Sequence, residues 1–458
     1  MKIRIINLMF FLILFTVSGC ASVSDQKELR DVQSQIEQRT QKKLDWDLGS
    51  NDEETVQEKI QSVLQSPLTA DTAVEIALIN SPSLQAEFEE LGIHKADLVQ
   101  AGLLKNPSVS GFFRKPSDDG KTNTEFEVKQ DVLSLLTLPL RKEMSNAQLL
   151  QAQYAATEAV LHLDSDVKNA YYTLQAAQQM RVMQKKIVKA EEAALELAQR
   201  QFDAGNVNDL VVTSDQIALN RAQMDLSQMD VEVIEAQENL GRLMGLSNQP
   251  ESWNIEDNLP SISKEEPSLE ILESKATSQN VDLLMARQEV KVREKALNVS
   301  RVNGLPEIAA GFNTEKESNG NRLEGPVFEV EVPIFDQKQT TVARSKAQLR
   351  QSQERLKAKE DEIQSQVRLK YNSLLVTKNR VETYLQSVLP LHAKFIHSLQ
   401  KHYNYMLVGV YDLLNAKKEE IESYHKFVES LKDYWLLRSE LERLIGEKIE
   451  YVPDQGGM

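Results

Sequence analysis

Residues 147–153 read AQLLQAQ, and a closely similar segment, AQLRQSQ, occupies residues 347–353, 200 positions further along the chain. The same shift places Gly111-Phe112 over Gly311-Phe312. Chance similarity between two helical sequences would not keep the Gly-Phe pairs in phase with the helices. We therefore predict an internal two-fold repeat, with a duplicated unit of about 200 residues that is far longer than the unit of a solenoid protein.

Long helices are expected around both copies of this segment. Residues 140–202 contain neither Gly nor Pro, and residues 337–403 are interrupted only by Pro390, where we expect a kink or a break. Apolar residues recur in both stretches at a seven-residue spacing, which predicts a left-handed supercoil against neighbouring helices. In the second copy the spaced residues are Val342, Leu349, Leu356 and Ile363 and, after a shift of four residues, Val367, Leu374, Val381, Val388 and Phe395. An isolated coiled-coil rod would show the same periodicity.

Four shorter helical patterns have roughly half the length of the long ones. They cover residues 69–105, 209–245, 267–303 and 412–446. Two such helices stacked end to end would match one long helix, because every helical residue adds the same rise. The pattern predicts a wall of full-length helices paired with stacked half-length helices.

Two pairs of short segments alternate between apolar and polar residues, as β-strands do. They are expected at about residues 107–115 and 123–132 in the first copy and 305–314 and 325–334 in the second. The predicted apolar, lipid-facing side carries Phe126, Val128, Phe328, Val330 and Val332, and the predicted lumen-facing side carries Glu125, Glu127, Glu329 and Glu331.

Strands with one apolar and one charged face are typical of a membrane β-barrel with a wet lumen. A soluble hairpin with a polar face would look similar. Four strands cannot close a barrel, and open sheet edges are not left in lipid. The membrane interpretation therefore requires several copies of the chain.

The N-terminus predicts export and lipid attachment. Lys2 and Arg4 precede an apolar run at residues 8–17, which has the length of a signal-peptide core, and the run leads into Ser18-Gly19-Cys20. This ending resembles a bacterial lipoprotein processing site, with residues 1–19 removed and Cys20 acylated, palmitate being among the expected acyl chains. A plain secretory signal with a chance Cys is the alternative. The polar residues 20–66 then form a lipidated tether.

Composition excludes several functional classes. The chain has 458 residues and a formal net charge of −16, which argues against a nucleic-acid partner because phosphate binding needs a basic face. The single Cys excludes a disulfide scaffold, and the six His form no H-E-x-x-H pair. We find no catalytic, cofactor-binding or metal-binding motif and expect no enzyme activity, no cofactor and no metal.

From about residue 67 to residue 446 the chain resembles the TolC family of outer-membrane efflux proteins. The matching segments include Leu68-Thr69, Asn80-x-Pro82-x-Leu84, Ala101-Gly102-Leu103-Leu104, Phe202-Asp203-Ala204-Gly205, Val332-Pro333-Ile334-Phe335-Asp336, Val408-Gly409 and Leu444-Ile445-Gly446. Their order and duplication make the resemblance specific. It implies a mainly α-helical homotrimer in which each protomer adds four strands to a shared twelve-stranded barrel above a long coiled-coil helical tunnel.

This resemblance implies a domain organisation with two efflux repeats. The first repeat covers residues 67–246 and the second residues 267–446, joined by a linker at 247–266 and followed by a tail at 447–458.

Two expected helix–helix turns carry further candidate residues. Gly205 and Gly409 each interrupt a helical pattern, where Gly supplies the left-handed backbone of a turn, and Asp209 or Asp412 can cap the following helix. The family resemblance implies that these turns form the periplasmic tip that contacts an adaptor. The candidate tip residues are Gly205, Asp209, Leu210, Gly409, Asp412 and Leu413.

The sequence thus predicts a passive, lipid-anchored export channel in the outer membrane of a Gram-negative bacterium. The resemblance implies three partners: further copies of the chain in a homotrimer, a periplasmic membrane-fusion adaptor and an inner-membrane efflux pump that supplies the energy. The alternative is a periplasmic coiled-coil adaptor or scaffold lipoprotein without a pore. The two lipid-compatible hairpins discriminate between them, because an adaptor has no need of such strands.

Overall fold

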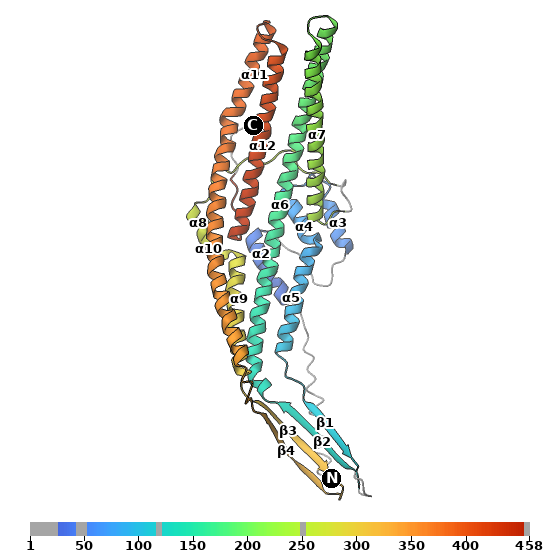
Figure 1. Ribbon diagram of the computed structural model, residues 1–458, viewed down its shortest axis with the longest axis vertical. Helices are drawn as coiled ribbons and strands as arrows, with labels where there is room; N and C mark the ends of the chain where they lie inside the picture. Colours follow the sequence, from blue (N-terminus) through green and yellow to red (C-terminus); the bar gives the residue numbers. More distant parts are fainter. Residues whose placement is uncertain (1–25, 43–52, 116–120, 248–252, 453–458) are drawn as a thin grey trace. The chain divides into compact units, whose positions relative to one another are not determined.

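The computed structural model describes residues 26–42, 53–115, 121–247 and 253–452, so the predicted signal segment and Cys20 lie outside the described residues. The fold is mostly α-helical with one four-stranded antiparallel sheet (Figure 1), as the sequence predicted. The chain divides into two compact units. Unit 1 comprises Met1–Asp31, Phe88–Tyr154 and Met285–Lys357, and unit 2 comprises Val32–Glu87, Ala155–Leu284 and Ala358–Met458. Each unit combines segments from both copies of the repeat.

The sheet belongs to unit 1 and unites the strands of the two copies. Its strands are β1 (Ser108–Arg114), β2 (Asn123–Asp131), β3 (Glu307–Lys316) and β4 (Arg322–Glu331), in the spatial order β1-β2-β3-β4. The central pairing, β2 with β3, joins the first hairpin to the second.

Both strands of the second hairpin differ in position from the prediction. β3 begins and ends later than the expected 305–314, and β4 begins and ends earlier than the expected 325–334. Gly320, with φ +97°, permits the turn between them. Val332 lies beyond β4 and is followed by Pro333, which has no N–H for the ladder.

Besides the strands and the first residues of the N-terminal helix, unit 1 contains parts of four helices: α5 (Pro82–Ala101), α6 (Leu133–Asp203), α9 (Val281–Val302) and α10 (Gln339–Thr383). Polar contacts tie α9 to both long helices. Gln288 donates from Nε2 to the carbonyl of Ala147 at 2.9 Å, and the hydroxyls of Ser300 and Ser345 lie 2.9 Å apart.

Two helices that were predicted as continuous are each broken at corresponding places in the repeat. The expected 69–105 helix consists of α4 (Ala70–Asn80) and α5, and the expected 267–303 helix consists of α8 (Leu269–Gln279) and α9. Ser81 has an extended ψ of 113°, as a residue before proline prefers, and Asn280 has a ψ of 124°.

The two asparagines at these breaks make the same contact. Asn80 donates to the carbonyl of Met244 and Asn280 to that of Leu444, both at 2.9 Å. Each break therefore allows a side-chain amide to satisfy a carbonyl at the C-terminal end of another helix.

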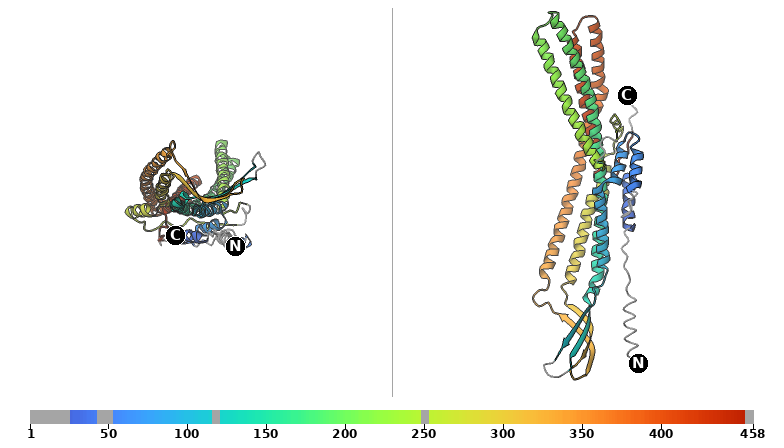
Figure 2. Two further views of the ribbon diagram at one scale, coloured as in Figure 1. Left: turned by 90° about the horizontal axis from the view of Figure 1, so that it is seen from below. Right: turned by 90° about the vertical axis from the view of Figure 1, so that its right-hand side faces the viewer.

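Unit 2 contains two helical hairpins, shown in Figures 1 and 2. One joins α6 to α7 (Asp209–Leu243), and the other joins α11 (Leu389–Asn404) to α12 (Val410–Ile445). A small apolar cluster connects them, formed by Ile187, Val188, Leu219, Ala222 and Ile421. Long helices of this kind are held by such packing rather than by intrinsic propensity alone.

The expected kink or break at Pro390 takes the form of a π-helical turn, η1 (Tyr384–Val388), between α10 and α11. A π turn holds one residue more than an α turn, so it absorbs an insertion without ending the helix. Pro390, which has no N–H to donate, is the second residue of α11, directly after this turn. Phe395, which the seven-residue spacing placed in the core, is 51% exposed beyond this turn.

The segments expected to be a tether, a linker and a tail also contribute to the core. The N-terminal segment forms α2 (Gln26–Thr40) and α3 (Glu53–Val63), and Val32 and Ile36 of α2 are fully buried. Trp253 and Ile262 from residues 247–266 are buried, as is Ile449 near the C-terminus. Apolar residues scattered through polar stretches account for this packing.

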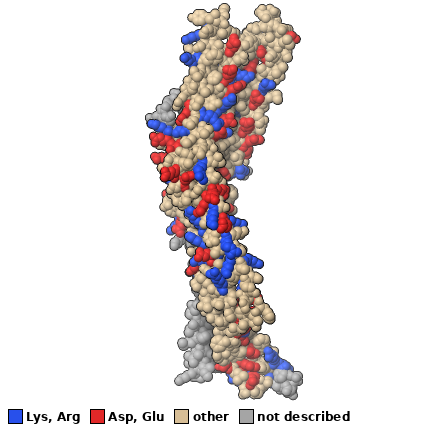
Figure 3. All heavy atoms as spheres, turned by 60° about the vertical axis from the view of Figure 1, so that its left-hand side comes forward, with Lys and Arg blue, Asp and Glu red and all other residues tan. Residues whose placement is uncertain are grey.

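Within the described ranges, no helix combines the length and the apolar character needed to span a bilayer. Acidic and basic side chains are interspersed along the helices on the face shown in Figure 3.

Candidate functional site

The register of the sheet places four of the predicted lipid-facing residues on one face. Residues opposite each other in neighbouring strands share a face. Val128 lies opposite Phe312, Phe328 opposite Ala310 and Val330 opposite Ile308. Phe126, two residues before Val128, is on the same side. Val332 is exposed but lies beyond the end of β4.

Four further residues of this apolar face were not identified from the sequence. They are Val109, Phe113, Ile308 and Phe312, of which Phe113 contacts Phe126 edge-on with ring centroids 5.6 Å apart. The alternation of these apolar residues with residues of the opposite face was present in the sequence. In β1 it is obscured by Phe112, which lies on the polar face beneath the guanidinium of Arg114, 5.4 Å from its ring centroid.

The opposite face carries the four predicted acidic residues, Glu125, Glu127, Glu329 and Glu331. Lys129 links two of them: its Nζ lies 2.5 Å from Oε1 of Glu127 and 2.7 Å from Oε2 of Glu329. This bridge crosses between the two copies of the repeat. The partners of Lys129 could not be identified from the sequence, because they depend on the strand register.

The other predicted residues lie at the turns of the hairpins in unit 2. In the α6–α7 turn Gly205 has φ +73°, and the N–H of Asn206 donates to the carbonyl of Gln201 at 2.8 Å. This is the Schellman arrangement that ends many helices. Asp209 is the first residue of α7, and Leu210 is 71% exposed.

The α11–α12 turn has the same geometry but different residues. The N–H of Leu407 donates to the carbonyl of His402 at 2.9 Å, and the left-handed residue is Met406, with φ +61°. The structural counterpart of Gly205 is therefore Met406, 201 positions later. The expectation of a left-handed Gly409 was wrong, because Gly409 has φ −81° and precedes α12 as its N-cap.

Asp412 caps the start of α12. Its Oδ2 accepts a hydrogen bond from the backbone N–H of Gly409 at 2.9 Å, whereas Asp209 makes no such bond because it occupies the first helical position. Leu413 is partly buried. Both turns contain the sequence Asp-Leu, but Asp209 is the first residue of α7 whereas Asp412 is the third residue of α12.

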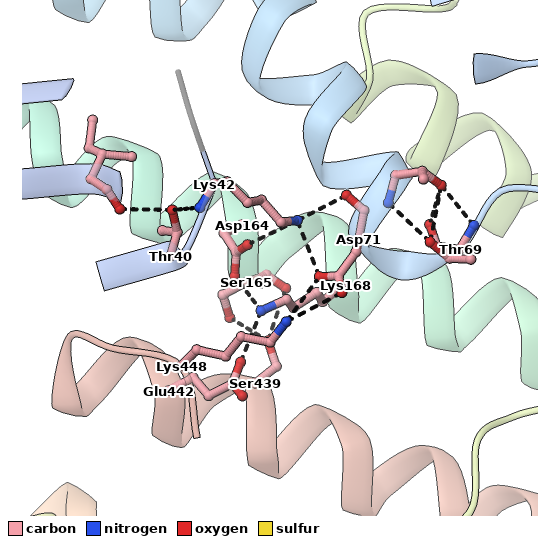
Figure 4. A network of polar contacts seen from close by, with 12 residues as sticks. Thr40, Lys42, Thr69, Asp71, Asp164, Ser165, Lys168, Ser439, Glu442 and Lys448 are labelled. Atoms are coloured by element: carbon pink, nitrogen blue, oxygen red, sulfur yellow. Dashed lines mark hydrogen bonds and ion pairs between the residues drawn. The ribbon is translucent and has the colours of Figure 1, made fainter. Parts of the chain in front are cut away.

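A buried network of charges joins four segments of unit 2 (Figure 4). Lys168 on α6 lies 2.7 Å from Asp164 and 2.9 Å from Glu442 on α12. Lys42, which follows α2, donates to the carbonyl of Asp71 at 2.9 Å and lies 3.3 Å from its carboxylate. The network was not predicted, because its members are far apart in the sequence.

The two buried lysines respond differently to their surroundings. Burial opposes the charged form of Lys168, but the carboxylates of Glu442 and Asp164 outweigh this effect and raise its pKa above the usual value. Burial lowers the pKa of Lys42, and Asp164 and Asp71 compensate only in part. The surroundings of Lys168 therefore favour its charged form, whereas those of Lys42 disfavour it, and removal of a single carboxylate partner would leave a costly buried charge.

The family model described as outer membrane efflux protein matches residues 137–246, which cover most of α6 and all of α7. This part of the chain is therefore similar to outer membrane efflux proteins. The chain is also similar to the cobalt-zinc-cadmium resistance protein CzcC of Cupriavidus metallidurans. It is 20% identical over 388 residues, which cover 83% of this chain and 90% of the relative.

Solved structures show the same fold at low sequence identity. A membrane protein from Pseudomonas aeruginosa matches with a TM-score of 0.71 and 14% identity, over 83% of this chain and 90% of that chain. The outer membrane protein VceC from Vibrio cholerae matches with a TM-score of 0.67 and 14% identity, over 83% and 97%. Members of the efflux family are passive transport channels of Gram-negative outer membranes and not enzymes, and the family has no known cofactor.

Proposed function

We propose that this chain is a member of the outer membrane efflux protein family and forms a homotrimeric export duct that spans the outer membrane. In this proposal a periplasmic membrane-fusion adaptor docks at its helical tip, and an inner-membrane efflux pump drives substrate through it. The two-faced sheet is the observation that carries the proposal. Its apolar face, with Phe126, Val128, Phe328 and Val330, is suited to lipid, and its acidic face is suited to a water-filled lumen.

The sheet also supports the oligomeric part of the proposal. Among the described residues, β1 and β4 each pair on one side only, so the sheet of each protomer has two open edges. Open edges are not stable in lipid, because the bilayer supplies no hydrogen-bonding partners. Pairing β4 of one copy with β1 of the next, around a three-fold axis, would satisfy both edges.

The exposed turns of the hairpins support the docking part of the proposal. Tyr405, Met406 and Leu407 form an apolar turn in which Met406 is 93% exposed, and Leu210 is exposed beside the other turn. A left-handed non-glycine residue is strained, and such strain is often retained at functional sites. We assign adaptor contact to these turns, together with Gly205, Asp209, Gly409, Asp412 and Leu413.

Acylation of Cys20 is the remaining part of the proposal. Its support is the position of the only Cys directly after a signal-like segment. Several acyl chains would give a stable second anchor beside the sheet, whereas a single chain would be marginal.

Single-channel conductance in planar bilayers, with oligomer mass measured on the same sample, tests the proposal. We expect a trimer with discrete conductance steps, and an open-tip variant would be used if the wild-type tip remains closed. A monomer that never inserts would instead favour the periplasmic scaffold. Cobalt, zinc and cadmium, which the name of the relative CzcC mentions, are the first cargo to test.

A further inference from the structure

The four connections between strands and helices in unit 1 lie at one end of the sheet (Figure 1). The side-chain amide of Gln130, in β2, donates to the carbonyl of Lys105 at 2.9 Å, which ties the connection before β1 to its neighbour strand. A Cβ added to Gly304, before β3, would lie 3.2 Å from the carbonyl oxygen of Gln337, after β4. The connections of both hairpins therefore form one band across this end of the sheet.

Each of these connections exposes large apolar side chains, which we call the apolar band. Its members are Leu103 and Leu104 before β1, Leu135 and Leu136 where α6 begins, Leu305 before β3, and Ile334 and Phe335 after β4. The ring of Phe335 is 93% exposed. Exposed apolar side chains gathered at one level of a protein mark a surface that contacts a membrane or another protein.

Basic side chains follow the apolar band on the adjoining helices. The first 15 residues of α10, 339–353, contain Arg344, Lys346 and Arg350 and no Asp or Glu. All three are exposed, and none pairs with an acidic residue in the part of the chain that the structure describes. By the standard helical rise, Arg344 and Lys346 lie about 8 Å and 11 Å from the start of α10. Arg301 is exposed one residue before the end of α9.

Acidic side chains at the same end of the sheet already have partners or belong to the polar face. A carboxylate oxygen of Asp131 lies 2.8 Å from Nζ of Lys105, and one of Asp336 lies 3.1 Å from Nζ of Lys338. Glu331, the last residue of β4, belongs to the acidic face. The cations of Arg344 and Lys346 are therefore available to an anion from outside the protomer.

The positions of Arg344 and Lys346 around α10 ensure that one of them faces outward in a closed ring of helices. Residues two apart are separated by about 200° on an α-helix. The buried side of this part of α10 carries Ser345 and Ser352, and Ser345 lies between the two cations. The cations therefore project on opposite sides of the packing seam. In a ring, one of these sides faces the channel and the other faces the surroundings.

We propose that the apolar band and these basic residues bind acidic phospholipids. Phe335 and its apolar neighbours enter the edge of the hydrocarbon layer, and the outward cation of the Arg344 and Lys346 pair binds the headgroup phosphate. Apolar side chains beside Lys and Arg are typical of protein surfaces that bind anionic membranes. The inference rests on the proposed duct, because it places these lipids in the periplasmic leaflet of the membrane that the duct spans.

Lipid titration of the full-length protein in an uncharged detergent tests the inference. The probes are dioctanoyl phosphatidylglycerol and dioctanoyl phosphatidylcholine, which share acyl chains and a phosphate but differ in net charge. Microscale thermophoresis measures both affinities, and the oligomer mass is measured on the same sample. We expect the acidic lipid to bind about fivefold more tightly. The preference should weaken when the NaCl concentration rises from about 50 mM to about 500 mM, because salt screens exposed charges.

Arg344→Gln with Lys346→Gln is the test variant. The matched control is Arg355→Gln with Lys357→Gln, because these exposed residues lie 11 positions further along α10, on the same two sides of the helix. The control removes the same charge about 16 Å farther from the sheet. We expect the test variant to lose about fivefold in affinity for the acidic lipid and the control to lose less than about twofold.

The outcomes separate this inference from the proposed duct. A trimer that binds both lipids equally at low salt would overturn the inference and leave the duct proposal standing, as would equal losses in the two double variants. Phe335→Ser should weaken binding of both lipids to a similar extent. Loss of the trimer in that variant would instead show that Phe335 contacts a second copy, which would overturn its role in lipid binding. A monomeric wild-type protein would overturn the duct proposal as well.

Discussion

The two hairpins of unit 2 have nearly the same turn but bury their helices very differently. In the first, α6 runs without interruption and buries Ile187, Val188, Ala194 and Ala198. In the second, α11 follows a π turn and has no buried residue. The repeat therefore preserved the local geometry of the chain while the packing of the two copies diverged.

One inserted residue explains why the packing of the two hairpins differs. The two copies are offset by 200 positions at Tyr171 and Tyr371 but by 201 at the turns, where Gly205 corresponds to Met406. The extra residue falls within the segment that contains η1. A regular helix has no room for such a residue without rotating everything beyond it, whereas a π turn does. The hairpins can thus be compared by single-residue deletions.

Deletion of Lys185 should have the largest effect. Lys185 lies in the regular part of α6, at the position that corresponds to Gln386 in η1. Its removal would rotate the rest of the helix by about 100° and move Ile187 and Val188 away from Leu219. We expect a loss of more than about 4 kcal/mol of stability. Urea-dependent proteolysis of the hairpin measures it, and retention of wild-type resistance would refute the regular packing of α6.

Truncation of one buried and one exposed apolar residue should give the second-largest difference in stability between the two hairpins. Leu219→Ala removes a buried side chain from the shared cluster and should cost about 2–4 kcal/mol. Phe395→Ala should cost less than about 1 kcal/mol in the detergent-dispersed protomer, since its ring is half exposed there. Thermal unfolding of matched samples compares the two. Similar losses in both variants would contradict the difference in burial.

Substitutions at the left-handed residues should have smaller and opposite effects. Gly205→Ala should destabilise the first turn by about 1 kcal/mol through backbone strain alone, because no atom lies within 4 Å of the added Cβ. Met406→Gly relieves the strain in the second turn and should be neutral or stabilising by about 0.5 kcal/mol. Hydrogen exchange at the turn amides reports both changes. A loss on Met406→Gly would show that its side chain stabilises the protomer.

Deletion of Gln386 should have the smallest effect of all. Removing one residue from η1 converts the π turn into an α turn and keeps Val381 and Ile396 on the inner face. We expect stability within about 0.5 kcal/mol of the parent protein, as for a surface substitution. Circular dichroism melting, run beside the Lys185 deletion, measures the contrast. If both deletions are equally damaging, η1 is not the place where the extra residue is absorbed.

Local periodicity in the sequence was sufficient for the broad architecture. The repeat, the long helices and the two faces of the strands were predicted because helical and strand spacing are properties of neighbouring residues. Phe126 and Glu127 could therefore be assigned to opposite faces before any strand pairing was known. Partners such as Lys129 and Glu329 could not, because the register joins residues from different copies.

The tertiary structure determined interruptions of the regular pattern that the sequence did not reveal. The sequence predicted an interruption at Pro390, but not that it is a π turn, and it did not predict the breaks at Ser81 and Asn280 or the left-handed Met406. Lys42 likewise became a core residue only through Asp71 and Asp164. Periodicity determines which side of a helix is apolar, but which apolar side is buried depends on the partners that the fold brings together.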